Sequence, residues 1–179
     1  MDYIVRKATL DDREAIAELI ADSTRHLSRE HYAEAQIEAA LASVFGVDSD
    51  LIHDETYYVA EKAGTLIGCG GWSRRKKLYG GDRYANRNAE FLDPVNDPAK
   101  IRAFFVHPQH ARKGVARAIL DQCERDASEY GFQALELLST LPGIQFYEAC
   151  GYSRNGDFDL ELDGGVKIPF VPMRKNLQS

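Results

Sequence analysis

The chain has 179 residues, of which 44% are apolar and 28% are charged, and its formal net charge is −6. This length fits one domain that buries its own core without disulfides or metals. The negative charge argues against a nucleic-acid partner held by phosphate contacts. No apolar run approaches the ~20 residues that cross a membrane, and the first twenty residues are unlike a signal peptide. We therefore expect a cytoplasmic protein with no membrane partner.

The three cysteines, Cys69, Cys123 and Cys150, are far apart in the sequence and form no CxxC pair. Their spacing predicts neither a disulfide framework nor a zinc site. Cys150 is a candidate nucleophile, although a small buried thiol packing beneath a helix is the favoured interpretation. His107 and His110 read as turn residues without metal-ligand spacing, so no metal is expected.

The first part of the chain predicts a strand followed by two helices. Residues 3–7 alternate apolar and charged side chains, and Thr9 followed by two acids is typical of a helix start. A second helical pattern covers roughly residues 29–44, and the acidic stretch 48–55 is predicted to be a loop. The apolar face of the first helix is formed by Leu10, Ile16, Leu19 and Ile20.

Two strands and a long loop come next. Residues 56–61 and 65–72 are rich in β-branched and aromatic residues, and the Lys62-Ala63-Gly64 connection between them predicts a hairpin. Residues 74–98 contain a basic run, several Asn and Asp residues and two prolines. A loop of this length in a compact domain is more often functional than idle.

The most informative stretch is a strand, a tight turn and a helix within residues 101–120. Residues 101–106 form an apolar strand that Pro108 ends, and the helix begins at Gly114. A helix N-terminus offers unpaired N–H groups and partial positive charge, to which basic residues around the glycine add full charges. This pattern predicts a pyrophosphate site. The alternative is an ordinary strand-to-helix connection with solvated basic side chains. The buried helical face is predicted at Val115, Ile119, Cys123 and Ala127.

The last part of the chain predicts a strand, a short helix and a final hairpin. Gly131 ends the long helix, residues 134–138 form a strand, and the short helix covers residues 142–149. Residues 158–162 and 166–173 flank the final turn. The resulting class is α/β (α+β), with parallel pairing around the helix at 114–130 and antiparallel pairing elsewhere.

Two motifs resemble the GNAT N-acetyltransferase superfamily, and the order of elements resembles it over essentially the whole chain. Residues 105–116 look like the family's acyl-CoA loop, where Gly114 and Ala116 match and Ala111 stands in place of the usual Gln or Arg. Residues 146–152 (FYEACGY) look like its FYE-x-x-GF segment. The resemblance implies a single acyl-CoA N-acyltransferase domain over residues 1–179. Its fold would be a mixed, mostly antiparallel sheet flanked by helices, with a parallel strand pair splayed at the acyl-CoA site.

The resemblance also implies acetyl transfer from acetyl-CoA, as co-substrate, to a primary amine of a small molecule or protein. The amine would attack directly in a ternary complex. Tyr147 occupies the position of the general acid for the leaving thiolate. The strand at Phe104, Phe105 and Val106 would hold the pantetheine arm and thioester. The pyrophosphate would be bound around Arg112, Lys113, Gly114, Val115, Ala116 and Arg117.

The general base is left open by the sequence. Many family members carry a glutamate on the central strand, but residues 100–105 contain no carboxylate. The candidates are Glu90, Asp93 and Asp97, or an ordered water. Thr140 stands where an asparagine is frequent in the family. For Tyr32 and Trp72, the alternatives are an acceptor pocket and the core.

Other functions compete with the enzyme. A non-catalytic acyl-CoA-binding regulatory protein would keep the fold and lose the chemistry, and the missing strand glutamate favours it while Tyr147 disfavours it. A nucleotide-binding protein using Gly114 as a phosphate loop would lack the Lys-Ser/Thr pair that positions magnesium. The C-terminal hairpin offers a sheet edge for a homodimer.

Overall fold

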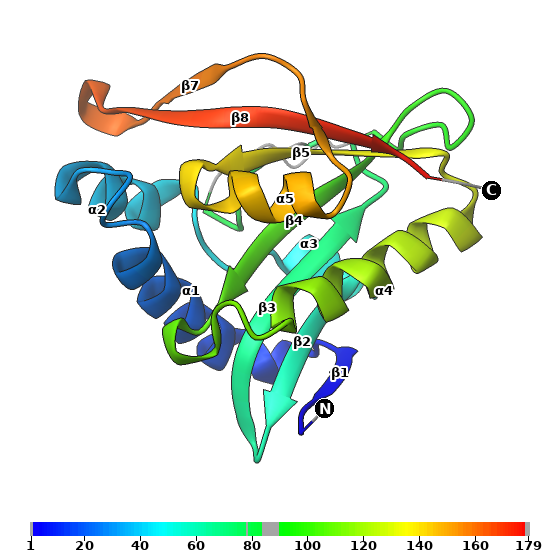
Figure 1. Cartoon of the computed structure of the whole chain (residues 1–179), viewed down its shortest axis with the longest axis horizontal. Coiled ribbons are helices and arrows are strands. Elements are labelled where there is room, and N and C mark those ends of the chain that lie inside the picture. Colours follow the sequence, from blue (N-terminus) through cyan, green and yellow to red (C-terminus); the bar gives the residue numbers. More distant parts are fainter. Residues whose placement is uncertain (1, 78, 84–89, 178–179) are drawn as a thin grey trace.

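A mixed β-sheet forms the centre of the molecule, and helices cover both of its faces (Figure 1). The computed structural model describes residues 2–77, 79–83 and 90–177. The strand order is β1-β2-β3-β4-β5-β8-β6, and β7 also pairs with β8. The strands are β1 Ile4–Lys7, β2 Tyr57–Lys62, β3 Thr65–Ser73, β4 Ala99–Val106, β5 Ala134–Thr140, β6 Ser153–Arg154, β7 Phe158–Glu161 and β8 Lys167–Asn176.

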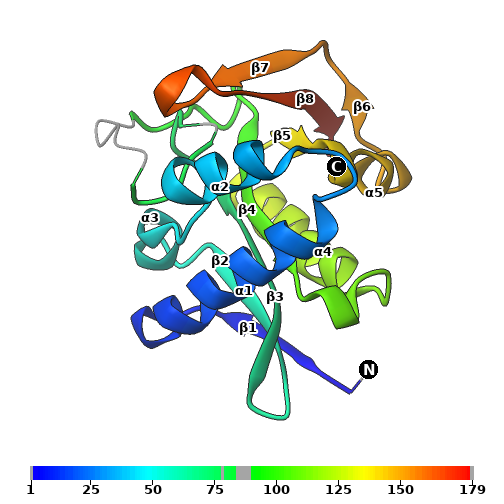
Figure 2. The same cartoon turned by 90° about the vertical axis from the view of Figure 1, so that its left-hand side faces the viewer.

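The helices are divided between the two faces of the sheet. Figure 2 looks onto the side where α1, α2 and α3 lie, with α4 behind the strands. Alternate residues of β2 point to opposite faces. Tyr58 and Ala60 pack in the hydrophobic cluster that includes the buried residues of α4, while Tyr57 and Val59 pack in the cluster that includes those of α1. The helices are α1 Arg13–Leu27, α2 Glu34–Ser43, α3 Ser49–His53, α4 Val115–Tyr130 and α5 Ile144–Ala149.

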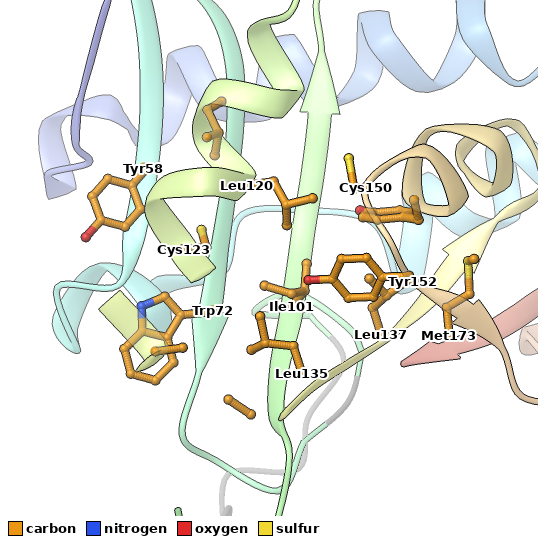
Figure 3. Packing of buried hydrophobic residues seen from close by; sticks show 14 of the residues in the cluster. Tyr58, Trp72, Ile101, Leu120, Cys123, Leu135, Leu137, Cys150, Tyr152 and Met173 are labelled. Atoms are coloured by element: carbon orange, nitrogen blue, oxygen red, sulfur yellow. The ribbon is translucent and has the colours of Figure 1, made fainter. Parts of the chain in front are cut away.

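Helix α4 begins and ends as its sequence predicts. Gly114 precedes it with a φ of 84° and Gly131 follows it with a φ of 109°, both in the left-handed region that favours glycine. Its four predicted core residues are all buried. They join Trp72, Ile101 and Leu135 in the main hydrophobic core, which Figure 3 shows between α4, the sheet and the C-terminal segment.

The parallel strands β4 and β5 separate soon after they pair. The two strands pair only at Ala99↔Leu135 and Lys100↔Glu136. Beyond these residues β4 contains a β-bulge opposite β3, where Ala103 has a φ of 57°. A bulge bends its strand and increases the local twist. The expected fold is therefore confirmed, including a mostly antiparallel sheet with one parallel pair.

Three details of the N-terminal half differ from the expectations. The stretch 48–55 contains α3, because Leu51 and Ile52 supply enough apolar surface to bury a helical turn against the sheet. Leu10 is 50% exposed, since α1 begins only after a short 3₁₀ turn at Leu10–Asp12. Helix α2 begins at Glu34 and not near residue 29. No helix in the described part of the chain is both long and apolar enough to cross a membrane.

Candidate active site

A cavity of about 540 Å³ occupies the space where β4 and β5 separate. The loops 44–48 and 79–81 line it, together with the 111–117 turn and helix start. Its walls also include parts of α1, β4, β5, α5 and β8. Of the residues predicted to bind the cofactor or act in catalysis, those that line it are Phe104, Phe105, Val106, Arg112, Gly114, Val115, Ala116, Arg117 and Tyr147.

The turn before α4 provides an open backbone surface at one end of the cavity. Arg112 has a φ of 61° and Gly114 a φ of 84°, and no atom lies within 4 Å of where a Gly114 Cβ would stand. Arg112 and Arg117 line the cavity here, whereas Lys113 is exposed and does not. The Arg117 guanidinium also pairs with Asp121 over 3.0 Å. Open N–H groups at a helix start suit a bound anion.

Tyr147 on α5 lies in the wall of the cavity on the α4 side. Its residue is 7% exposed, and its ring packs edge-on against Phe104 with the two centroids 6.4 Å apart. Phe146 and Tyr152 pack against the same ring. Burial raises the pKa of the Tyr147 hydroxyl, which therefore stays protonated at neutral pH. The ring of Tyr147 is thus held beside β4 by aromatic contacts, and its hydroxyl is protonated.

The bulged strand β4 sends consecutive side chains to opposite faces of the sheet. Phe104 belongs to the α4 core, whereas Phe105 packs on the α1 side. Gly70 makes room for Phe104, because a Cβ at residue 70 would lie 2.6 Å from the phenylalanine ring. The Val106 N–H donates to Ser23 Oγ over 3.3 Å. The cavity is therefore lined from both faces of the sheet.

Two charged residues of the site, Asp48 and Arg102, were not predicted. They form an ion pair with Nη2 and Oδ2 2.6 Å apart, and both line the cavity. Burial raises the pKa of Asp48, although the Arg102 guanidinium opposes this shift. Asp48 lies in a stretch that the sequence predicts to be a loop, so nothing in the sequence marks it as a site residue. Arg102 is a charged residue within an apolar strand, and this is the one sequence feature that indicates a buried ion pair.

The carboxylates considered as the general base lie elsewhere. Glu90 is exposed and pairs with Lys76. Asp97 accepts a hydrogen bond from the Asp93 N–H over 2.9 Å, within a turn. None of Glu90, Asp93 and Asp97 lines this cavity.

The other residues singled out in the sequence divide between the cavity and the core. Thr140 lines the cavity, whereas Tyr32 and Trp72 do not. The Tyr32 hydroxyl donates to the Pro169 carbonyl and accepts from the Leu141 N–H, and Trp72 packs in the main core. Cys150 is buried with Sγ 3.3 Å from an Arg117 nitrogen, and its pKa is raised by burial, which suits packing better than nucleophilic attack.

These features define an α/β protein whose cavity is lined from both faces of a splayed sheet. Open backbone N–H groups at the start of α4 and a buried tyrosine both border this cavity. Residues 13–152 match the family model described as the acetyltransferase (GNAT) family. The chain therefore belongs to the GNAT acetyltransferase family. No curated protein matches the chain significantly.

Solved structures share the fold at low sequence identity. A GCN5-related N-acetyltransferase from Rhodopseudomonas palustris has 19% identity and a TM-score of 0.73, covering 99% of this chain and 97% of that one. The PaiA N-acetyltransferase from Thermoplasma acidophilum, in complex with coenzyme A, has 18% identity and a TM-score of 0.62, with coverages of 98% and 99%. The yncA protein from Salmonella typhimurium, with its cofactor acetyl-CoA, has 16% identity and a TM-score of 0.66, with coverages of 100% and 96%.

Proposed function

We propose that the protein transfers the acetyl group of acetyl-CoA to a primary amine by direct attack in a ternary complex. The observation that carries this proposal is the continuity of one cavity, which joins the open turn before α4 to Tyr147. The fit to acetyl-CoA rests on two features. Gly114 leaves open space at the helix start, and β4 departs from β5 after Lys100. The solved relatives that hold coenzyme A or acetyl-CoA give further support.

Each part of the site then has a role. The backbone around Arg112–Arg117 binds the pyrophosphate, and the strand at Phe104–Val106 holds the pantetheine arm and thioester. Arg112 and Arg117 add positive charge at the same end of the cavity. Because the turn fixes the backbone N–H groups before the ligand arrives, little ordering of the chain is needed on binding.

Tyr147 is assigned as the general acid. The neutral amine attacks the thioester carbon, so that a C–N bond forms and the C–S bond breaks. The Tyr147 hydroxyl gives its proton to the departing thiolate, and the amine gives its surplus proton to water. A general acid must be protonated before it acts, and a tyrosine hydroxyl, with an ordinary pKa of about 10, is protonated at neutral pH.

Thiol release in the presence of acetyl-CoA and a panel of primary amines tests the proposal. We expect release that depends on both components, with the acetylated amine found by mass spectrometry. Tight binding of acetyl-CoA without amine-dependent release would instead favour a non-catalytic acyl-CoA-binding regulatory protein.

A further inference from the structure

Three phenylalanine rings meet at the face of the cavity turned away from Tyr147. Phe45 follows α2, Phe105 belongs to β4, and Phe170 belongs to β8. The Phe45 centroid lies 5.6 Å from that of Phe105 and 6.0 Å from that of Phe170, and all three residues line the cavity. Phe45 therefore connects the two sides of the splayed sheet with an aromatic surface.

This aromatic surface and Tyr147 lie on different faces of the sheet. Phe104 contacts Tyr147, whereas the next residue, Phe105, contacts Phe45. Since neighbouring strand residues point to opposite faces, the cavity has a tyrosine side and a phenylalanine side that meet at β4. A group held on the phenylalanine side would approach the thioester from the face opposite the acid.

The two charged side chains that line the cavity on the phenylalanine side form a pair. Asp48 and Arg102 line the cavity there and pair with each other. Within the described part of the chain, Asp48 Oδ1 and Arg102 Nε have no hydrogen-bond partner, and Arg102 Nη2 contacts Asp48 Oδ2 without a well-formed hydrogen bond. Buried polar atoms are rarely left so, because an unmade hydrogen bond costs free energy. The unpartnered carboxylate oxygen points to a polar group of a ligand.

We propose that the acceptor is a primary amine that carries one positive charge in solution, loses a proton before attack, and has an aromatic or bulky apolar body. Its body packs against Phe45 and Phe105, and its amine binds at Asp48. A second cationic group would have to leave water for an apolar wall, and Asp48 is the one carboxylate among the described residues that line the cavity. This inference rests on the proposed acetyl transfer and names the substrate class for it.

Specificity constants for 2-phenylethylamine, ethanolamine and 1,4-diaminobutane test the inference. Full burial of a large apolar side group is worth about 1.5–3 kcal/mol, so 2-phenylethylamine should exceed both others by about tenfold or more. Phe45→Ala should remove most of this preference, whereas Phe91→Ala, at an exposed ring outside the cavity, should leave it intact. A preference for either small polar amine would overturn the inference while leaving acetyl transfer in place.

The role of Asp48 is tested by a neutral version of its pair, Asp48→Asn with Arg102→Gln, which avoids a lone buried charge. By calorimetry with coenzyme A present, this double variant should bind 2-phenylethylamine about tenfold more weakly, as expected for a lost charged hydrogen bond. The matched control replaces the Arg75–Asp54 pair, joined at 2.7 Å outside the cavity, in the same way. Equal binding by both double variants would overturn the assignment of Asp48.

The same calorimetry separates the inference from the proposed function. Binding of 2-phenylethylamine to the wild-type protein without its acetylation would keep the amine subsite and reject acetyl transfer. No detectable binding, together with rapid acetylation of polar amines, would reject the subsite and keep acetyl transfer.

Discussion

Arg102 and Asp48 join β4 to the segment before α3 through an ion pair in which both side chains are 2% exposed. Arg102 also donates to the Lys77 carbonyl over 3.0 Å, so the pair ties three segments together beside the cavity. Taking two charges out of water is costly, and the cost is met only while both partners are present.

Removal of one partner should therefore be much worse than removal of both. Asp48→Ala leaves the buried Arg102 guanidinium unpaired and should lower the free energy of unfolding by about 3–5 kcal/mol. The double variant Asp48→Asn, Arg102→Gln should recover a large part of this loss. Urea denaturation measures both. A double variant as unstable as the single one would show that the charges do not interact in this way.

The Arg6–Asp12 pair should make stability depend on acidic pH. The hydrogen bonds from Arg6 lower the pKa of Asp12 to about 2, below its ordinary value of 3.8. A depressed folded-state pKa gives stability that is complete above the unfolded value and is lost as the pH falls from about 4 to 2. The shift corresponds to about 2 kcal/mol, so Asp12→Asn should cost about that much at pH 7 and much less at pH 2. Urea midpoints at the two pH values check this, and an equal cost at both would contradict it.

Gly114→Asp should weaken acetyl-CoA binding by tenfold or more, because it sets a carboxylate beside the proposed pyrophosphate site, a repulsion on the order of 1–2 kcal/mol. Gly64→Asp is a matched control, since Gly64 also has a positive φ, at 79°, and open space around its Cβ position, but lies in the β2–β3 hairpin. Calorimetry on both variants separates backbone strain from ligand repulsion. If Gly114→Asp and Gly64→Asp bind acetyl-CoA equally well, no anion site lies beside Gly114.

Arg112→Ala should weaken acetyl-CoA binding by about 1–3 kcal/mol, the usual worth of a hydrogen bond to a charged group. Lys113→Ala is the comparison, because Lys113 is the neighbouring cation that does not line the cavity. The two dissociation constants should differ clearly. If Lys113→Ala weakens binding as much as Arg112→Ala, general attraction and not a direct contact explains the effect.

The elements that could be predicted from the sequence are those set by local chemistry. Gly114 and Gly131 bound α4 because each takes a positive φ, and the Ala63-Gly64 turn closes the β2–β3 hairpin for the same reason. Phe104, Phe105 and Tyr147 could be assigned to the site because they belong to, or directly adjoin, two short motifs that resemble those of the family.

What could not be predicted depends on contacts between distant segments. Asp48 and Arg102 are 54 positions apart, and neither belongs to a motif that names its partner. Helix α3 is held by the burial of Leu51 and Ile52, which an acidic local sequence conceals. The phenylalanine side of the cavity likewise combines a loop with two strands that are not neighbours in the sheet.

The most direct test of the account is the steady-state kinetics of Tyr147→Phe with any amine that the wild type acetylates. The change removes one oxygen and keeps the ring that packs against Phe104. The turnover number should fall by about 10²–10⁴-fold, with little change in the Michaelis constant for acetyl-CoA, because the proton is donated only in the transition state. Tyr130→Phe, at a half-exposed tyrosine outside the cavity, should leave turnover unchanged. A Tyr147→Phe turnover within about threefold of wild type, far below the range for a general acid, would contradict the account.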